Sequence, residues 1–218
     1  MRFINVWSYK CADYLMKQLK DSHEKRNVYY YGFQIVLGSI VKAIIFFLVT
    51  YLLGIFIPSM LVLLFFGFIR IIAGGYHMDK FNKCLITSLG MFVMAAFISK
   101  YVSPYLAREY LMASSGLIFI LGMYVLIRWA PGDTPNKPIT KPEKIRRFKT
   151  ISIVNICIWL VGNVVLSYFN LKMYALAGCL GTLLALFIVS PAGYSFFGMI
   201  STKFDIKKKK VRQQNAEL

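Results

Sequence analysis

Residues 33–75 read FQIVLGSIVKAIIFFLVTYLLGIFIPSMLVLLFFGFIRIIAGG, and this stretch decides the fold. It contains only two charged residues, and Pro58 and the pair Gly74-Gly75 bound two apolar runs within it, about 33–57 and about 59–72. A helix needs about 20 residues to cross the hydrocarbon of a bilayer. The first run therefore predicts a full transmembrane span. The second predicts a short span that is tilted or partly re-entrant.

The rest of the chain repeats this pattern. Hydrophobic residues make up 58% of the 218, and the mean hydropathy is +0.59. A soluble domain of this length cannot bury so much apolar surface, whereas a bilayer accepts it on the exterior. We therefore predict an all-α integral membrane protein with about six spans. The four further spans are expected at about 84–102, 110–130, 151–169 and 173–197.

The N-terminal segment 1–31 is basic, and its apolar residues recur at close to helical spacing. This pattern predicts an amphipathic helix lying on the membrane surface, with a solvated tail as the alternative. The sequence has no internal repeat or long linker, so one membrane domain is expected over 32–200. It includes a basic loop at 131–149, and a basic tail follows at 201–218.

The basic residues indicate the topology. The net charge is +17, and all but four of the 26 Lys and Arg residues fall in loops and termini that six spans would place on one side. Because cytoplasmic loops are enriched in Lys and Arg, we predict that both termini and the segment 70–84 are cytoplasmic. Charge clustered between apolar runs favours anionic lipid head groups as its partner and argues against nucleic-acid binding.

The segment RIIAGGYHMDKFNKC, residues 70–84, joins the second and third predicted spans. It holds Cys84 and also His77, one of only two histidines in the chain. A thiolate is the competent cysteine nucleophile, and a nearby imidazole can favour it and carry its proton. On one continuous helix the two side chains would lie about 10 Å apart along the axis, too far for a hydrogen bond of about 3 Å. They can meet only if the chain turns, which the Gly-Gly pair and the polar residues 79–83 predict.

Other residues of this segment are candidates for supporting roles. Cys84 is expected at the start of the third span, where a helix N-terminus favours a thiolate. Asp79 either orients the imidazole of His77 or starts a turn. Arg70 either snorkels to the interface or binds a substrate carboxylate or a developing oxyanion. The simpler alternative, in which the cysteine merely packs, stays open on spacing alone.

The cysteines give no sign of a metal or disulfide framework. They are scattered, with no Cys-x-x-Cys pair, at Cys11, Cys84, Cys157 and Cys179. With only two histidines, this pattern predicts neither a disulfide scaffold nor a structural zinc site, and no cofactor is expected.

The pattern Arg70-x-x-Ala-Gly-Gly-x-His77, with Cys84 seven residues later, resembles the motif of the accessory gene regulator protein B (AgrB) family. The resemblance includes the basic N-terminal segment and the Pro-rich loop APGDTPNKP at 130–138, and it extends to about residue 200. It implies a membrane cysteine endopeptidase of the bacterial cell membrane that matures a quorum-sensing pheromone. By position, Cys84 would be the nucleophile and His77 its base. Arg70 and Gly75 match further important positions, whereas Asp79 is not a fixed part of the pattern.

The resemblance also implies the substrate and the chemistry. The partner would be an AgrD-like precursor peptide with an amphipathic leader, a short central peptide and an acidic C-terminal tail. Cys84 would release that tail, and a Cys or Ser of the precursor would then attack the thioester, closing a thiolactone or lactone. A homodimer is a further expectation. Candidate residues that attract the acidic tail, unless they are simply solvated loop residues, are Lys137, Lys141, Arg146 and Arg147.

The sequence also bears on two other functional classes. A small transporter or channel is the main alternative, because Lys42 would lie about 13 Å deep in the first span. Few other polar residues lie in the spans, and an ion pathway normally needs more of them. A lipid-modifying transferase is disfavoured, because such enzymes need clustered carboxylates for a metal and the nine acidic residues here do not cluster.

Overall fold

The computed structural model describes residues 2–76, 78, 81–132, 142–200 and 202. Within these residues every regular element is a helix, and Gly74 and Gly132 form an isolated parallel β-bridge between two loops. Residues 191–200 are helical as well. The named helices are α1 (Arg2–Leu19), α2 (His23–Leu52), α3 (Phe56–Ala73), α4 (Phe81–Val102), the 3-10 turn η1 (Ser103–Tyr105), α5 (Arg108–Trp129), α6 (Pro142–Tyr168) and α7 (Lys172–Val189).

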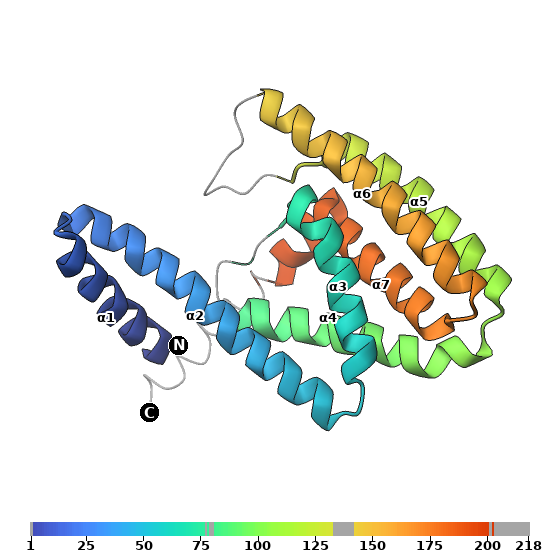
Figure 1. The fold of residues 1–218 in the computed structure, drawn as a ribbon, viewed down its shortest axis with the longest axis horizontal. Helices are drawn as coiled ribbons and strands as arrows, with labels where there is room; N and C mark the ends of the chain where they lie inside the picture. Colours follow the sequence, from blue (N-terminus) through green and yellow to red (C-terminus); the bar gives the residue numbers. More distant parts are fainter. Residues whose placement is uncertain (1, 77, 79–80, 133–141, 201, 203–218) are drawn as a thin grey trace.

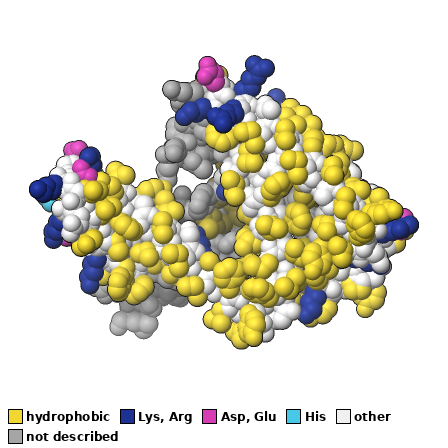
Figure 2. Space-filling model, viewed as in Figure 1, with side chains coloured by type: hydrophobic (Ala, Val, Ile, Leu, Met, Phe, Trp, Pro, Cys, Tyr) yellow, Lys and Arg dark blue, Asp and Glu magenta, His cyan; other side chains and the backbone are white. Residues whose placement is uncertain are grey.

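Six of the described helices are long and apolar enough to cross a membrane: α2, α3, α4 with η1, α5, α6 and α7. Their most apolar windows have a mean hydropathy of 1.7 to 2.3. Figure 2 shows hydrophobic side chains over most of the visible face, with Lys and Arg near its margins. Apolar surface on the outside is what lipid contact requires. The predicted all-α membrane protein with six spans is confirmed.

Helix boundaries differ from those predicted at two basic segments. Helix α2 begins at His23, well before the expected start at Phe33, so part of the N-terminal basic segment continues into the first span. Helix α6 begins at Pro142, so the end of the predicted basic loop is helical. Polar residues at the end of a span do not stop its helix, because the backbone hydrogen bonds are the same in the head-group region as in the hydrocarbon.

Two prolines also act differently from the prediction. Pro58 was expected to end the first span, but it lies in the first turn of α3, where its missing N–H leaves no hydrogen bond unmade. Pro191 was expected inside the last span, but α7 ends at Val189. Ser190, the residue before it, is extended with φ −75° and ψ 155°. Proline disfavours helical geometry in the preceding residue, so the chain breaks there and resumes as helix over 191–200.

The packed core lies among α3, α5, α6 and α7, here called the inner bundle (Figure 1). Its buried side chains include Trp159, Leu126, Ile69 and Leu186. Helices α3 and α7 approach closely because Gly181 has no side chain. A Cβ there would lie 2.6 Å from the carbonyl oxygen of Val62. Helix α4 packs against both of them.

Helices α1 and α2, residues 2–52, form what we call the α1–α2 arm, which projects from the other helices (Figure 1). The predicted N-terminal helix is present as α1. It packs along α2, and Tyr9 accepts a hydrogen bond of 3.0 Å from Arg26. The buried face of α1 repeats every fourth residue, at Ile4, Ser8, Ala12 and Met16. The buried face of this amphipathic helix therefore packs against α2. Its location at the membrane surface stays a prediction.

Candidate functional site

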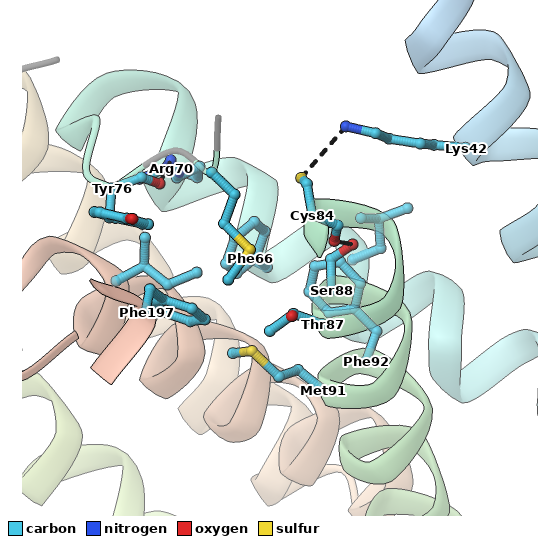
Figure 3. A pocket seen from close by; sticks show the side chains of 13 residues that line it. Lys42, Phe66, Arg70, Tyr76, Cys84, Thr87, Ser88, Met91, Phe92 and Phe197 are labelled. Atoms are coloured by element: carbon cyan, nitrogen blue, oxygen red, sulfur yellow. Dashed lines mark hydrogen bonds between the residues drawn. The ribbon is translucent and has the colours of Figure 1, made fainter. Parts of the chain in front are cut away.

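Cys84 is the fourth residue of α4 and lines a cavity of about 240 Å³ between α2, α3, α4 and the C-terminal helical segment (Figure 3). Its thiol is free and half-buried. The predicted break is present, because α3 ends at Ala73 and α4 begins only at Phe81. The predicted place of Cys84 near a helix start is therefore confirmed. His77 and Asp79, its predicted partners, lie outside the described residues.

Lys42 is a charged group in direct contact with the thiol. Its Nζ donates a hydrogen bond of 3.3 Å to Cys84 Sγ (Figure 3). It also lies 5.0 Å from the ring centroid of Phe81, a cation–π distance. The residue that sequence reasoning assigned to a transport pathway thus contacts the candidate nucleophile.

Arg70 lines the same cavity, but its guanidinium is bound to the backbone. Nη1 donates to the carbonyl of Gly74, and Nη2 donates to the carbonyl of Tyr76 at 2.5 Å. These are the carbonyls of the turn that follows α3, so Arg70 closes that turn onto its own helix. A positively charged donor makes stronger hydrogen bonds than a neutral one. The arrangement holds the start of the 74–84 segment in place.

Gly74 and Gly75 make this turn possible. Their φ angles are +68° and +118°, which side chains rarely adopt. A Cβ on Gly75 would clash with the Arg70 guanidinium and lie 2.9 Å from the carbonyl oxygen of Ile188. The turn is pinned on both sides, because Gly75 N–H donates to Gly132 and Tyr76 N–H donates to Ile188, at 3.3 and 3.2 Å. Three parts of the chain therefore meet at this turn: the segment after α3, the segment after α5 and the end of α7.

An aromatic group closes one wall of the cavity. The Tyr76 ring stacks on Phe197 with centroids 5.7 Å apart, and its edge contacts Tyr194 at 5.4 Å. Both partners come from the 191–200 helix. The break at Ser190 turns this helix back onto the site. A continuous last span would not have placed these residues there, and the sequence prediction missed them for that reason.

The remaining walls are mostly apolar, with two hydroxyl groups on α4. Ser88 Oγ is bonded to the Cys84 carbonyl at 2.6 Å, as a helix-internal hydrogen bond. Thr87 also faces the cavity (Figure 3). Such a surface suits a substrate segment that is apolar and extended, and it offers few groups that hold water. The apolar lining residues are Leu63, Phe66, Met78, Met91, Phe92, Ile188 and Phe197.

The other predicted residues are separate from this cavity. Arg146 and Arg147 are exposed near the start of α6, while Lys137 and Lys141 lie outside the described residues. Asn163 and Cys179, which are buried between helices, bond each other at 3.2 Å. No group of three His, Cys, Asp or Glu side chains that could hold a metal ion occurs among the residues the structure describes.

Comparison with known proteins gives the family. A family model described as accessory gene regulator B matches residues 8–189. Accessory gene regulator protein B of Staphylococcus saprophyticus is 32% identical over 162 residues, which are 72% of this chain and 80% of that protein. A protein named AgrB-like from Clostridium acetobutylicum is 38% identical over 108 residues, 50% of this chain and 49% of that protein. No solved structure gives a significant match. The chain therefore belongs to the accessory gene regulator B family, as a multi-pass membrane protein with a role in the peptide processing of accessory gene regulator quorum sensing.

Proposed function

We propose that this protein is a membrane-embedded cysteine endopeptidase that removes the C-terminal tail of an AgrD-like pheromone precursor and promotes its cyclisation. Cys84 is the nucleophile and His77 is its general base. One observation carries the proposal: the free Cys84 thiol, near the start of α4, opens into a cavity with apolar walls and a cation in contact with the sulfur. Packing alone explains neither the cavity nor the cation.

The reaction has two acyl transfers. The Cys84 thiol gives its proton to His77, and its sulfur attacks the scissile carbonyl carbon. The C–N bond then breaks, the imidazolium protonates the leaving amine, and the tail departs from a thioester on Cys84. A thiol or hydroxyl of the same precursor next attacks the carbonyl carbon of this thioester and gives its proton to His77. The C–S bond then breaks, which closes the ring, and the released Cys84 thiolate takes the proton back from His77. The thioester retains much of the free energy of the cleaved bond, so ring closure needs no ATP.

The cavity walls serve the second step. Water attacking the thioester would give a linear product, so the site must favour the precursor's own nucleophile over water. Apolar side chains from α3 and α4, including Phe66, Met91 and Phe92, line the space below the sulfur (Figure 3). These side chains offer water no hydrogen-bonding partner. Exclusion of water here would raise the share of cyclic product.

The predicted topology supports access of the substrate from the cytoplasm. With the basic loops on the cytoplasmic side, both termini and Cys84 face the cytoplasm, where the precursor is made. The acidic tail of the precursor would meet exposed basic residues such as Arg146 and Arg147. A homodimer would bring two such sites together in one membrane complex.

The test combines thiol chemistry and turnover. The protein in nanodiscs would be incubated with an AgrD-like precursor, and intact-mass spectrometry would look for an acyl adduct that hydroxylamine removes. We expect this adduct on the wild-type protein. We expect it on neither the Cys84→Ala nor the His77→Ala variant. Cys11→Ala is the matched control, because Cys11 is a half-buried thiol on α1 that does not line the cavity. Tail release by the Cys84→Ala variant would overturn the proposal.

A further inference from the structure

Lys42 is a charged group at the site to which the proposed cleavage assigns no task. It lies within the apolar span α2, half-buried, with its Nζ 3.3 Å from Cys84 Sγ. Placing a lysine in a membrane helix is energetically costly, so such residues usually have a specific partner. Among the described residues no carboxylate forms a salt bridge with it. Its partners are the thiol and the face of the Phe81 ring.

The position of the ammonium is fixed by contacts on both sides of it. Gly38, one turn before Lys42 on α2, is packed against Phe81, and a Cβ there would lie 3.3 Å from the ring. Phe46, one turn after Lys42, packs edge-on against Phe92 of α4 with centroids 5.9 Å apart. These residues are spaced by four and so share one face of the helix. The docking of α2 on α4 therefore presents the ammonium to the sulfur.

The ammonium is placed to stabilise negative charge that develops on the sulfur. The two groups are in contact in an apolar part of the protein, where water screens their attraction little. The N-terminal end of α4 adds a partial positive charge near Cys84. An ammonium is permanently available for this task, whereas an imidazole that has accepted the thiol proton must give it up to the leaving amine.

We propose that Lys42 is a third catalytic residue, the cation that stabilises the Cys84 thiolate and then the oxyanion of the acyl-transfer intermediates. The inference rests on the proposed peptidase function. Lys42 keeps its proton throughout. The thiol proton goes to His77, the S–C bond forms, and the negative charge of the sulfur passes to the carbonyl oxygen bonded to the attacked carbon. That oxygen is two bonds from the sulfur, within reach of the same ammonium. When the C–N bond breaks, the charge on oxygen collapses and the leaving amine takes the proton from His77.

Other charged or titratable groups surround the thiol. Arg70 of α3 lies within electrostatic range of it, but its guanidinium donates to the carbonyls of Gly74 and Tyr76. Lys83 precedes Cys84 on α4 and is buried. The phenols of Tyr76 and Tyr194 lie on the C-terminal side of the cavity. His77, Asp79 and Lys80 lie outside the described residues. The test must therefore change the charge at residue 42 alone.

The experiment measures the alkylation rate of Cys84 by iodoacetamide against pH, using the full-length protein in nanodiscs and peptide mass spectrometry. Lys42→Met removes the charge and keeps an unbranched chain, and Lys42→Arg keeps the charge. Lys100→Met is the matched control, because Lys100 is also on a span but bonds the Gly54 carbonyl at 2.8 Å. We expect Lys42→Met to slow alkylation at neutral pH about tenfold or more and to move the rise of the profile to higher pH. Lys42→Arg should retain most of the rate, and Lys100→Met should match wild type.

A second reagent separates local charge from structure. For each protein we compare the rate of Cys84 alkylation by the anionic iodoacetate with the rate by the neutral iodoacetamide. The ratio of these two rates should be higher for wild type than for the Lys42→Met variant, because only the wild type presents a cation to the anionic reagent. Cys179 is 2% exposed and reports folding, since an intact bundle keeps it protected. Should Lys42→Met expose Cys179, Lys42→Gln takes its place.

The outcomes distinguish the two proposals. A pH profile and reagent ratio unchanged by loss of the Lys42 charge would overturn this inference, even if Cys84 still cleaves the precursor. Tail release by Cys84→Ala would overturn the peptidase instead, whatever the alkylation data. In precursor turnover we expect Lys42→Met to lower kcat about tenfold to a hundredfold with little change in KM, as loss of a group that acts only on the developing charge should.

Discussion

The inner bundle and the α1–α2 arm differ in how much of their apolar sequence is buried inside the protein. The most apolar window of α7 has a mean hydropathy of 1.9 and is 56% buried, whereas that of α2 reaches 2.3 and is only 17% buried. Hydropathy alone therefore does not say which spans form the core, because in a bilayer an apolar side chain is equally at home against lipid. What marks the inner bundle is its small residues, such as Gly178 and Gly181, where helices touch.

The site lies at the seam between these two regions. The inner bundle supplies the rigid parts: Arg70, the Gly74-Gly75 turn, and Ile188, which anchors the turn. The arm supplies one chemical group, Lys42, on a helix whose main neighbour is α1. The nucleophile is on α4, which contacts both. Changes in the bundle should therefore act through the fold, and a change at Lys42 should act through the reactivity of Cys84.

The largest effect should come from the closest contact of the inner bundle. Gly181→Ala would force α7 away from α3, because the new Cβ meets the Val62 carbonyl oxygen at 2.6 Å. We expect a loss of about 3 kcal/mol in unfolding free energy, measured by denaturation in detergent micelles. Gly162→Ala on α6 is the control, since its Cβ would meet nothing within 4 Å, and it should be neutral or slightly stabilising. Equal effects of the two changes would contradict close packing of α3 on α7.

The next effect concerns the turn that holds the site. Gly75→Ala combines a φ of +118° with a clash against Arg70 and Ile188, and we expect a cost of about 2 kcal/mol. Displacement of the 74–84 segment should also reduce precursor cleavage about tenfold or more. Gly54→Ala isolates the backbone strain, because Gly54 has a φ of +66° but its nearest foreign atom is Lys100 Nζ at 3.9 Å. Cleavage by Gly54→Ala should match wild type, and a comparable loss in both variants would count against a specific role for the turn.

The sequence predicted the fold well where long apolar runs decide it. Runs of about 20 apolar residues have one stable solution in a bilayer, a helix, so the class and number of spans followed directly. The ends were less certain, because Pro58 fits in a first turn as well as it ends a helix. The break at Ser190 rests on a single proline within an apolar run, and its consequence for the site required knowing where the 191–200 helix packs.

At the site, the spacing of residues along the chain predicted only those features that lie within the single segment 70–84. The need for a turn between His77 and Cys84 followed from helix geometry, and the structure interrupts the helix between Ala73 and Phe81. The position of Lys42 could not be deduced in this way, because it depends on how α2 docks on α4. A lone cation in an apolar span was a visible signal, but the sequence does not state which residue it meets. The roles of Cys84, His77 and Arg70 stay proposals for the experiments above.

A smaller effect should appear at the seam itself. Phe46→Ala removes the edge-on contact with Phe92 and empties part of the buried cluster that Phe46 forms with Val62, Ala95 and Ala177. We expect a loss of about 1.5 kcal/mol, seen as faster amide exchange in α2 with α5–α7 little changed. Leu48→Ala is the control, since Leu48 is 56% exposed. If exchange in α5–α7 rose equally, the arm would have to be an integral part of the inner bundle.

The smallest effect concerns the corner between α1 and α2. Lys25 and Tyr29 of α2 each bond the Asp21 carboxylate at 2.5 Å. These hydrogen bonds, with that of Lys25 the larger cause, hold the pKa of Asp21 below its usual 3.8. A lowered pKa means that the contact stabilises the corner at neutral pH and that this stabilisation fades as pH falls below about the usual value.

Asp21→Asn should therefore speed amide exchange in α1 slightly at neutral pH, and the difference from wild type should vanish in acid. Asp13→Asn is the matched control, because Asp13 pairs only with Lys17 on the same helix, at 2.8 Å, within the described residues. It removes a carboxylate of lowered pKa without touching the corner. Asp13→Asn should change exchange near Lys17 but not the docking of α1 on α2. If both substitutions loosened α1 alike, its attachment to the arm would depend on total charge and not on the corner contact.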